Sequence, residues 1–352
     1  MISEYSPFNR WKGLLHEAHL SGCARNDFLP PYWVATDPSN QCNNNCIYCN
    51  ARCFREKTKY ATMSGEHLLA LASLYRDWGI KATIIEGGGE PLAGERVTEF
   101  ISQCYLYDIE VGLITNGSLM NEPYWDILPA YARFVGISMD AADEKIYREI
   151  RRADTFGVVV RNIEGLCKNK KRLDVRAKML IQPLNYDKIY AFAKLAKEMG
   201  CDAAHIKPVS WEEVEGCESL DLSQYSDVIN MQIEKAKELI SDDFAVDIIT
   251  YKHDLQYRKI VNFKHCLCTP IGGVFAADGN FYLCFNMRGR DGFKLCSHFP
   301  DANNVRRHWN TKRHKELIAN IRPENCMRCG LIQYNEMIEK AIMQDKLFRN
   351  FP

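Results

Sequence analysis

The stretch Cys42-Asn-Asn-Asn-Cys46-Ile-Tyr48-Cys49 places three cysteines at C-x3-C-x2-C spacing, just after an apolar run typical of a strand, Tyr32–Asp37. Three thiolates can each bind one iron of a cubane 4Fe–4S cluster, which leaves the fourth iron without a protein ligand. Such an open iron can bind a small molecule. A zinc site normally takes four ligands, so a lone triplet fits zinc poorly. The stretch therefore predicts a reactive iron–sulfur site at the end of a strand.

Composition and charge limit the classes of protein to which the chain can belong. Its 352 residues, 46% of them apolar, suffice for one large globular domain and a smaller one. The formal net charge of +0 gives no general attraction to nucleic acid or to an anionic membrane. We find no apolar run of membrane-spanning length and no signal peptide. The 15 cysteines are then expected in a reducing cytoplasm, as metal ligands rather than disulfides.

Short apolar runs alternate with amphipathic stretches over much of the chain. Strands are expected at 32–37, 81–86, 110–115, 134–139, 175–182 and 203–207. Helices are expected between them, at 64–79, 97–105, 122–131, 143–149, 158–168 and 186–199. This alternation predicts an α/β fold, a partial (β/α)6 TIM-like barrel whose parallel strands are joined by right-handed crossovers. Ligands of such a fold bind at the carboxyl ends of the strands.

Polar motifs follow three of these strands. Gly87-Gly-Gly-Glu90 follows the second, where glycines let a backbone approach a ligand and a carboxylate can accept from an ammonium group. Thr115-Asn-Gly117 ends the third strand and Ser138-Met-Asp140 the fourth. Arg151 follows on a helix, and its paired N–H donors match a carboxylate. The alternatives are a simple glycine turn and a solvated helix charge.

A second group of cysteines fills the C-terminal part. Phe275–Cys284 is typical of a hairpin with Asp278-Gly279 as its turn. Counted from Cys268 the spacing is C-x10-G-x4-C, and counted from Cys266 it is C-x12-G-x4-C. Cys326 and Cys329 add a closing C-x2-C pair. Four cysteine ligands leave no open iron, so a cluster held here would transfer electrons rather than bind substrate.

Together these motifs resemble the radical S-adenosylmethionine (radical SAM) enzymes, with a SPASM/twitch extension at the C-terminus. In that family the open iron of the first cluster chelates SAM, and one electron splits SAM into methionine and a 5′-deoxyadenosyl radical. The resemblance implies that Cys42, Cys46 and Cys49 hold that cluster. It also implies SAM contacts by Tyr48, Gly88, Gly89, Glu90, Asn116, Ser138, Asp140 and Arg151. Tyr147 stands where the family often has histidine, a mild departure.

The resemblance implies a second, auxiliary 4Fe–4S cluster. A full SPASM domain would have cysteines where Asn335 and Glu339 stand, so the shorter twitch form is favoured. Its ligands would be Cys284, Cys326, Cys329 and either Cys266 or Cys268. Cys296 is left as a spare ligand, a hydrogen-atom donor or a core residue. The cysteines treated as structural are Cys23, Cys53, Cys104, Cys167, Cys201 and Cys217.

The chain is accordingly expected to fall into five parts. They are an N-terminal extension (1–31) with a helix laid against the following domain, the partial barrel (32–210), a bridging helix and strand (211–262), the twitch domain (263–332) and a C-terminal helix (333–352) that packs against the barrel.

The expected function is a radical SAM oxidoreductase of a small polar metabolite. The resemblance is to aminocyclitol dehydrogenases and sugar epimerases, with a peptide maturase as a further alternative. A dehydrogenase would pass the substrate's extra electron to the auxiliary cluster, whereas an epimerase would need a hydrogen donor such as Cys296. A flavodoxin or ferredoxin would reduce the first cluster. His205 and Lys207 are candidate substrate contacts, and the substrate and oligomeric state stay open.

Overall fold

The computed structural model describes residues 10–209, 220–251, 253–326 and 329–342. Within these ranges one sheet of ten strands runs through the molecule in the order β10-β9-β8-β1-β2-β3-β4-β5-β6-β7. Strands β1 to β7 are parallel neighbours, as successive crossovers require. The strands are β1 (Trp33–Thr36), β2 (Ala82–Ile85), β3 (Glu110–Thr115), β4 (Phe134–Ser138), β5 (Asp174–Ile181), β6 (Ala203–Pro208), β7 (Ala245–Ile248), β8 (Val274–Phe275), β9 (Asn280–Tyr282) and β10 (Lys294–Ser297).

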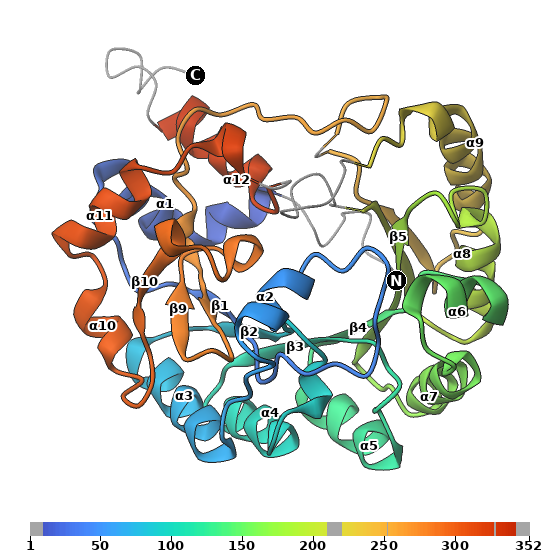
Figure 1. Cartoon of the computed structure of the whole chain (residues 1–352), viewed down its shortest axis with the longest axis horizontal. Coiled ribbons are helices and arrows are strands. Elements are labelled where there is room, and N and C mark those ends of the chain that lie inside the picture. Colours follow the sequence, from blue (N-terminus) through green and yellow to red (C-terminus); the bar gives the residue numbers. More distant parts are fainter. Residues whose placement is uncertain (1–9, 210–219, 252, 327–328, 343–352) are drawn as a thin grey trace.

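Helices surround the curved sheet, and α2 lies inside their arc (Figure 1). The helices that follow the parallel strands are α3 (Gly65–Trp78), α4 (Val97–Leu106), α5 (Glu122–Tyr131), α6 (Glu144–Arg151), α7 (Phe156–Lys168), α8 (Ile189–Glu198) and α9 (Ser226–Lys237). The others are α1 (Glu17–Arg25), α2 (Arg52–Lys57), α10 (Asn304–His308), α11 (Lys312–Ala319) and α12 (Ile332–Met337). The main core lies between the sheet and the outer helices.

Helix α3 shows how local sequence and packing agree. The Ser64 side chain accepts from the backbone N–H of His67 at its start, and Gly79 ends the helix in the left-handed region at φ +86. Tyr75 is buried on the inner face, and its hydroxyl lies 2.8 Å from Thr36 Oγ1 on β1. Thr36 Oγ1 is also 2.8 Å from Thr83 Oγ1 on β2. The helix therefore contacts the first two strands through satisfied polar groups as well as apolar surface.

The α/β fold predicted from the sequence is confirmed, and all six predicted strands are present. The sheet extends further than predicted at both ends. The strand assigned to the bridging segment, β7, pairs in parallel with β6, so it adds a seventh parallel strand. At the other edge β8 pairs in parallel with β1, and β8, β9 and β10 form antiparallel pairs. The predicted hairpin turns at Gly279, whose φ is +81.

The two ends of the described chain pack together. Helix α1 contacts the π-helical turn Ile338–Ile342 that follows α12. A small second core joins Leu20 and Cys23 of α1 to Cys268 and Ile338. The predicted C-terminal helix thus packs on α1 and the cysteine segment rather than on the barrel helices. Cys217 and the last part of that predicted helix lie outside the described residues.

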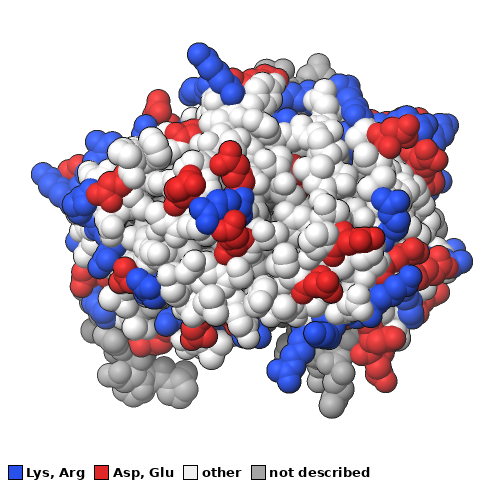
Figure 2. Space-filling view, turned by 90° about the horizontal axis from the view of Figure 1, so that it is seen from below, with Lys and Arg blue, Asp and Glu red and all other residues white. Residues whose placement is uncertain are grey.

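The face of the molecule shown in Figure 2 has no bias toward one charge. On the face shown in Figure 2, lysine and arginine side chains are mixed with aspartate and glutamate, as the balanced composition predicts. Within the described ranges, no helix combines the length and apolar character needed to cross a membrane.

Candidate active site at the carboxyl ends of the strands

A cavity of about 290 Å³ opens at the carboxyl ends of the parallel strands. Loops after β1, β2, β3 and β4 line it, together with the ends of β5 and β6 and a segment just after Cys284. The wall contains every barrel cysteine predicted to bind the first cluster and every residue predicted to contact SAM. They are Cys42, Cys46, Tyr48, Cys49, Gly88, Gly89, Glu90, Asn116, Ser138, Asp140 and Arg151. The candidates His205 and Lys207 line it as well. Motifs spread over much of the chain thus meet at one place.

The cysteine loop packs directly on the glycine turn after β2. The N–H of Gly89 donates to the carbonyl of Ser39 at 3.1 Å, and the N–H of Glu90 donates to the carbonyl of Gln41 at 2.7 Å. A Cβ added at Gly89 would lie 2.0 Å from the Gln41 carbonyl oxygen. Glycine is therefore required here by the close approach of two backbones, before any ligand binds.

Each of the three cysteine sulfurs has a donor nearby. The backbone N–H of Asn44 donates to Cys42 Sγ at 3.4 Å. Arg151 Nη1 lies 3.5 Å from Cys46 Sγ, and Arg55 Nη1 lies 4.0 Å from Cys49 Sγ. Two guanidinium groups and an N–H suit sulfurs that carry negative charge, as thiolates on a cluster do. The triplet therefore fits the three-cysteine cluster of the predicted site.

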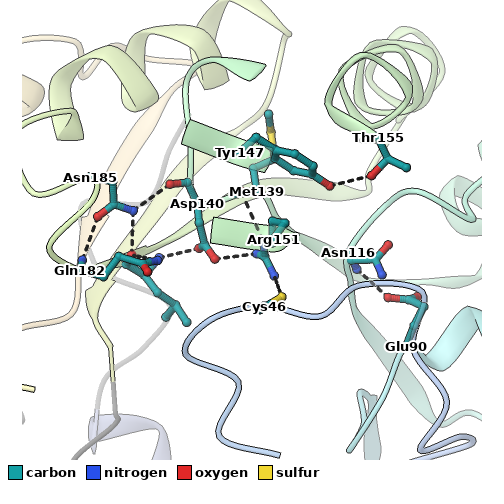
Figure 3. A network of polar contacts seen from close by, with 11 residues as sticks. Cys46, Glu90, Asn116, Met139, Asp140, Tyr147, Arg151, Thr155, Gln182 and Asn185 are labelled. Carbon is teal, nitrogen blue, oxygen red and sulfur yellow. Dashed lines mark hydrogen bonds and ion pairs between the residues drawn. The ribbon is translucent and has the colours of Figure 1, made fainter. Parts of the chain in front are cut away.

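Arg151 belongs to a buried network that fixes the end of β4 (Figure 3). Its Nη2 lies 2.9 Å from Asp140 Oδ2. Asp140 has a left-handed backbone at φ +64, and its Oδ1 accepts from the N–H of Leu180 at 2.8 Å. Asn185 Nδ2 donates to the Asp140 carbonyl at 2.7 Å. The sequence predicted that Arg151 contacts SAM; the structure adds that Asp140 and Cys46 position its guanidinium.

Glu90 is buried and its carboxylate already accepts several bonds. Thr115 Oγ1 donates to Oε1 at 2.6 Å, the N–H of Asn116 donates to Oε2 at 2.7 Å, and the N–H of Leu92 donates to Oε1 at 3.1 Å. Burial raises the pKa of Glu90, and these donors oppose the shift. Sequence reasoning assigned this carboxylate to SAM's amino group. In the structure it first ties the turn after β2 to the end of β3, with room for one further donor.

We expect Glu90→Gln to weaken SAM binding and to lower the free energy of unfolding, each by about 1–3 kcal/mol, because an amide N–H₂ would face N–H or O–H donors. Calorimetry with SAM and urea unfolding measure the two effects, and iron content should not change. Glu56→Gln is the matched control, since Glu56 lies exposed on the nearby helix α2. Unaltered SAM affinity and stability would show that the glycine turn does not depend on this charge.

Two groups in the cavity wall escaped sequence reasoning. Arg288, in the segment after Cys284, makes ion pairs with Asp37 at 2.9 Å and with Glu86 at 3.0 Å. Asp37 is fully buried, and burial raises its pKa to about 7, although Arg288 opposes the shift. Lys178 enters the cavity from β5, beside Lys207 on β6. No local motif marks either residue, because their neighbours come from distant parts of the sequence.

The C-terminal cysteines separate into two sets. Burial raises the pKa of Cys266, and the charges of Cys329, Cys284 and Cys326 raise it further, so these three thiols lie near Cys266. Cys268 is also near Cys266 and Cys329, but Cys284 and Cys326 are not among the charges that act on it. Cys268 is fully buried, and its neighbours include Cys23, Leu20 and Ile271 in the small core. The sequence left Cys266 and Cys268 as equal candidates for the fourth ligand. The packing favours Cys266 and gives Cys268 a core position.

Asn335 and Glu339 occupy the two positions where a longer SPASM domain would have cysteines. Asn335 Oδ1 accepts from the N–H of Leu267 at 2.7 Å and of Cys268 at 3.0 Å, while its Nδ2 lies 3.8 Å from Cys329 Sγ. Glu339 accepts from the N–H of Lys264 at 3.0 Å. Both side chains thus hold the segment that carries Cys266. The sequence showed only that these two positions lack cysteine, and the structure gives them a structural role.

Cys296 is outside the cavity wall. It lies on β10, opposite Phe281 of β9, and is 9% exposed within the main core. Burial raises its pKa to about 11. The structure therefore does not bring this candidate hydrogen donor to the site. Of the cysteines treated as structural, Cys104 and Cys201 are buried, whereas Cys53 is exposed.

Within the described ranges, no three His, Cys, Asp or Glu side chains converge closely enough to hold a single metal ion. A cubane cluster is larger than one ion and binds one cysteine at each of its irons, so its ligands do not meet at a point. The two cysteine sets are candidates for clusters in that sense.

Comparison with known proteins gives this geometry a context. The family model of the radical SAM superfamily matches residues 36–196, which span β1 to α8 and every barrel motif described above. This part of the chain matches the radical SAM superfamily. Radical SAM proteins use a 4Fe–4S cluster and SAM, and the cysteine triplet and the cavity beside it are the candidate sites for the two.

Among curated relatives, GTP 3′,8-cyclase of Campylobacter jejuni subsp. doylei is 26% identical over 261 residues, covering 70% of this chain and 78% of the relative. GTP 3′,8-cyclase of Clostridium perfringens is 26% identical over 279 residues, covering 76% and 81%. Streptococcus suis SuiB bound to its precursor peptide SuiA superposes with a TM-score of 0.64 at 16% identity, over 92% of this chain and 74% of SuiB. AdoMet-bound anSMEcpe gives 0.61 at 20% identity, over 82% and 83%. At these identities the two structures show a shared fold.

Proposed function

We propose that this protein is a radical SAM oxidoreductase acting on a small polar metabolite, with a second 4Fe–4S cluster held by Cys266, Cys284, Cys326 and Cys329. The observation that supports it most is the position of Cys284. This cysteine is followed directly by Phe285, Asn286 and Arg288, which line the cavity. A cluster held by Cys284 would therefore lie beside the segment that forms part of the cavity wall.

When bound, the cofactors supply one-electron chemistry: reductive cleavage of SAM at the first cluster and electron acceptance at the second. The protein's own part is to position them. Arg151, Arg55 and the Asn44 N–H face the cysteine sulfurs of the first site, and Glu90 fixes the strand ends on which SAM would lie. An external reductant of the flavodoxin or ferredoxin type would still supply the first electron.

The cavity also bears on the substrate. Two lysines in the wall make a cationic aminocyclitol a poor partner by simple repulsion, so we propose a neutral or anionic sugar-like substrate.

A second candidate is a radical cyclisation of a purine nucleotide. The names of the curated relatives favour it, since both are GTP 3′,8-cyclases aligned over most of this chain. The same anaerobic assay separates the two candidates. Metabolite extracts and, separately, GTP are incubated with SAM and a reductant, and substrate-dependent 5′-deoxyadenosine is followed. A product lacking two hydrogens supports the dehydrogenase, whereas a cyclised product from GTP would replace it.

Cys296→Ala is expected to retain turnover, with no carbon-bound deuterium appearing in product made in D₂O. The reason is that Cys296 lies in the core on β10 and not in the cavity wall. Among the described residues, the cysteines that line the cavity are Cys42, Cys46 and Cys49. Mass spectrometry of the product measures both points. Incorporation of one solvent deuterium, lost in the variant, would contradict the dehydrogenase and favour an epimerase.

A further inference from the structure

Two lysines from neighbouring strands enter the cavity side by side. Lys178 of β5 is opposite His205 of β6, and Leu180 is opposite Lys207, so Lys207 lies further toward the carboxyl ends. Lys178 reaches the cavity across Gly136 of β4, where an added Cβ would lie 2.6 Å from its Cδ. The missing side chain at Gly136 therefore gives the lysine stem its path.

The carboxylates that face these lysines already have arginine partners. Glu86 and Asp140 are the acidic groups whose charge acts on both ammonium groups. Glu86 pairs with Arg288 at 3.0 Å, and Asp140 pairs with Arg151 at 2.9 Å. In the part of the chain that the structure describes, neither lysine makes an ion pair or hydrogen bond. The wall thus presents two cations without a counter-ion of their own.

The charge state of the pair reflects this lack of a partner. Burial and, to a smaller degree, the neighbouring Lys207 lower the pKa of Lys178 to about 7, against the opposing charges of Glu86 and Asp140. Burial also lowers the pKa of Lys207. A bound anion would reverse both effects, because opposite charge favours the protonated form.

We propose that Lys178 and Lys207 bind a phosphate group of the substrate. Two separate ammonium groups on adjacent strands match the two charges and several oxygens of a phosphate, and lysine binds phosphate as a point charge. A carboxylate brings one charge and would leave one lysine unpaired. This inference rests on the proposed function, because it names a substrate class for the same cavity: a phosphorylated small molecule.

The test measures equilibrium binding of pyrophosphate to the anaerobic holoenzyme with SAM present and no reductant. Lys178→Met and Lys207→Met are each expected to weaken pyrophosphate binding about tenfold, because each removes an ionic hydrogen bond. Lys207→Arg should retain most of the affinity. Lys194→Met is the matched control, since Lys194 is exposed on α8 and pairs with Glu198. Iron content and thermal melting confirm that the variants are folded.

Three outcomes would overturn the proposal. Pyrophosphate affinity could be the same in both Met variants as in the wild type. Acetate could bind as tightly as pyrophosphate, which would make the site one for carboxylates. SAM affinity could fall in the Met variants while pyrophosphate affinity stays unchanged, which would assign the lysines to SAM's own carboxylate.

A pH series gives an independent readout, with sulfate as a dianion whose charge is constant between pH 6 and 8. Lys178 with a pKa of about 7 is mostly charged at the lower pH and mostly neutral at the higher. Sulfate affinity should therefore fall as pH rises in the wild type and change little in Lys178→Met. A pH slope that survives in Lys178→Met, for example through His205, would count against the proposal. Anion binding needs no SAM cleavage, so its failure and the failure of the proposed function are distinguishable.

Discussion

Replacing Cys42, Cys46 and Cys49 with alanine is expected to abolish SAM cleavage and to remove about four irons from a reconstituted protein that binds about eight. Among the residues that the structure describes, these three are the cysteines that line the cavity. Arg151, Arg55 and the Asn44 N–H face their sulfurs. Iron analysis and anaerobic assay of 5′-deoxyadenosine measure the two effects.

Cys53→Ala is the matched control for that experiment. Cys53 lies on α2, a few residues after Cys49, but is exposed. It should keep its full iron content and full activity. Continued SAM cleavage by the triple variant would show that the loop after β1 is not the reactive centre.

The second large effect is expected at the C-terminal cysteines. Cys326→Ala combined with Cys329→Ala should remove about four irons and end turnover, while the first cluster and SAM binding remain. Cys266→Ala should behave in the same way, because its thiol lies near Cys284, Cys326 and Cys329. The electron paramagnetic resonance signal of the first cluster reports that it is intact.

The variant Cys268→Ala tests whether Cys268 is a core residue, while Cys266, two positions earlier, is the cluster ligand. Cys268 packs among Leu20, Cys23 and Ile271, so the variant should keep its iron and lose only some stability. Large-to-small changes at buried apolar positions cost about 1–3 kcal/mol when so few atoms are removed. The reverse pattern, with iron lost from the Cys268 variant and kept by the Cys266 variant, would exchange the two assignments.

Sequence alone predicted the parts of this molecule that depend on local pattern. The six strands and the motifs that end them follow from apolar runs, glycines and polar residues close together in the chain. The convergence at one cavity follows as well, because parallel strands place their carboxyl ends at one edge. Glu90 lies in the cavity wall, as its motif predicted, but the pattern gave no sign of its bonds to Thr115 and the Asn116 N–H.

The remainder depends on contacts between distant segments. Lys178 gave no signal, since its importance comes from Lys207 on the next strand and from Gly136 beneath its stem. Arg288 pairs with Asp37 and Glu86 across most of the chain length. Cys266 is favoured over Cys268 by contacts with Asn335 and α1, which place Cys268 in the small core.

The pairing of β8 with β1 has a consequence for biogenesis. Ala35 of β1 lies beside Val274 of β8, so one edge of the strand that leads to the cysteine loop stays open until most of the polypeptide has left the ribosome. Unpaired strand edges in nascent chains favour association with other chains. Arg288, the counter-charge of buried Asp37, is also synthesised late. Shortened forms that end before β8 would keep all barrel motifs yet expose this edge.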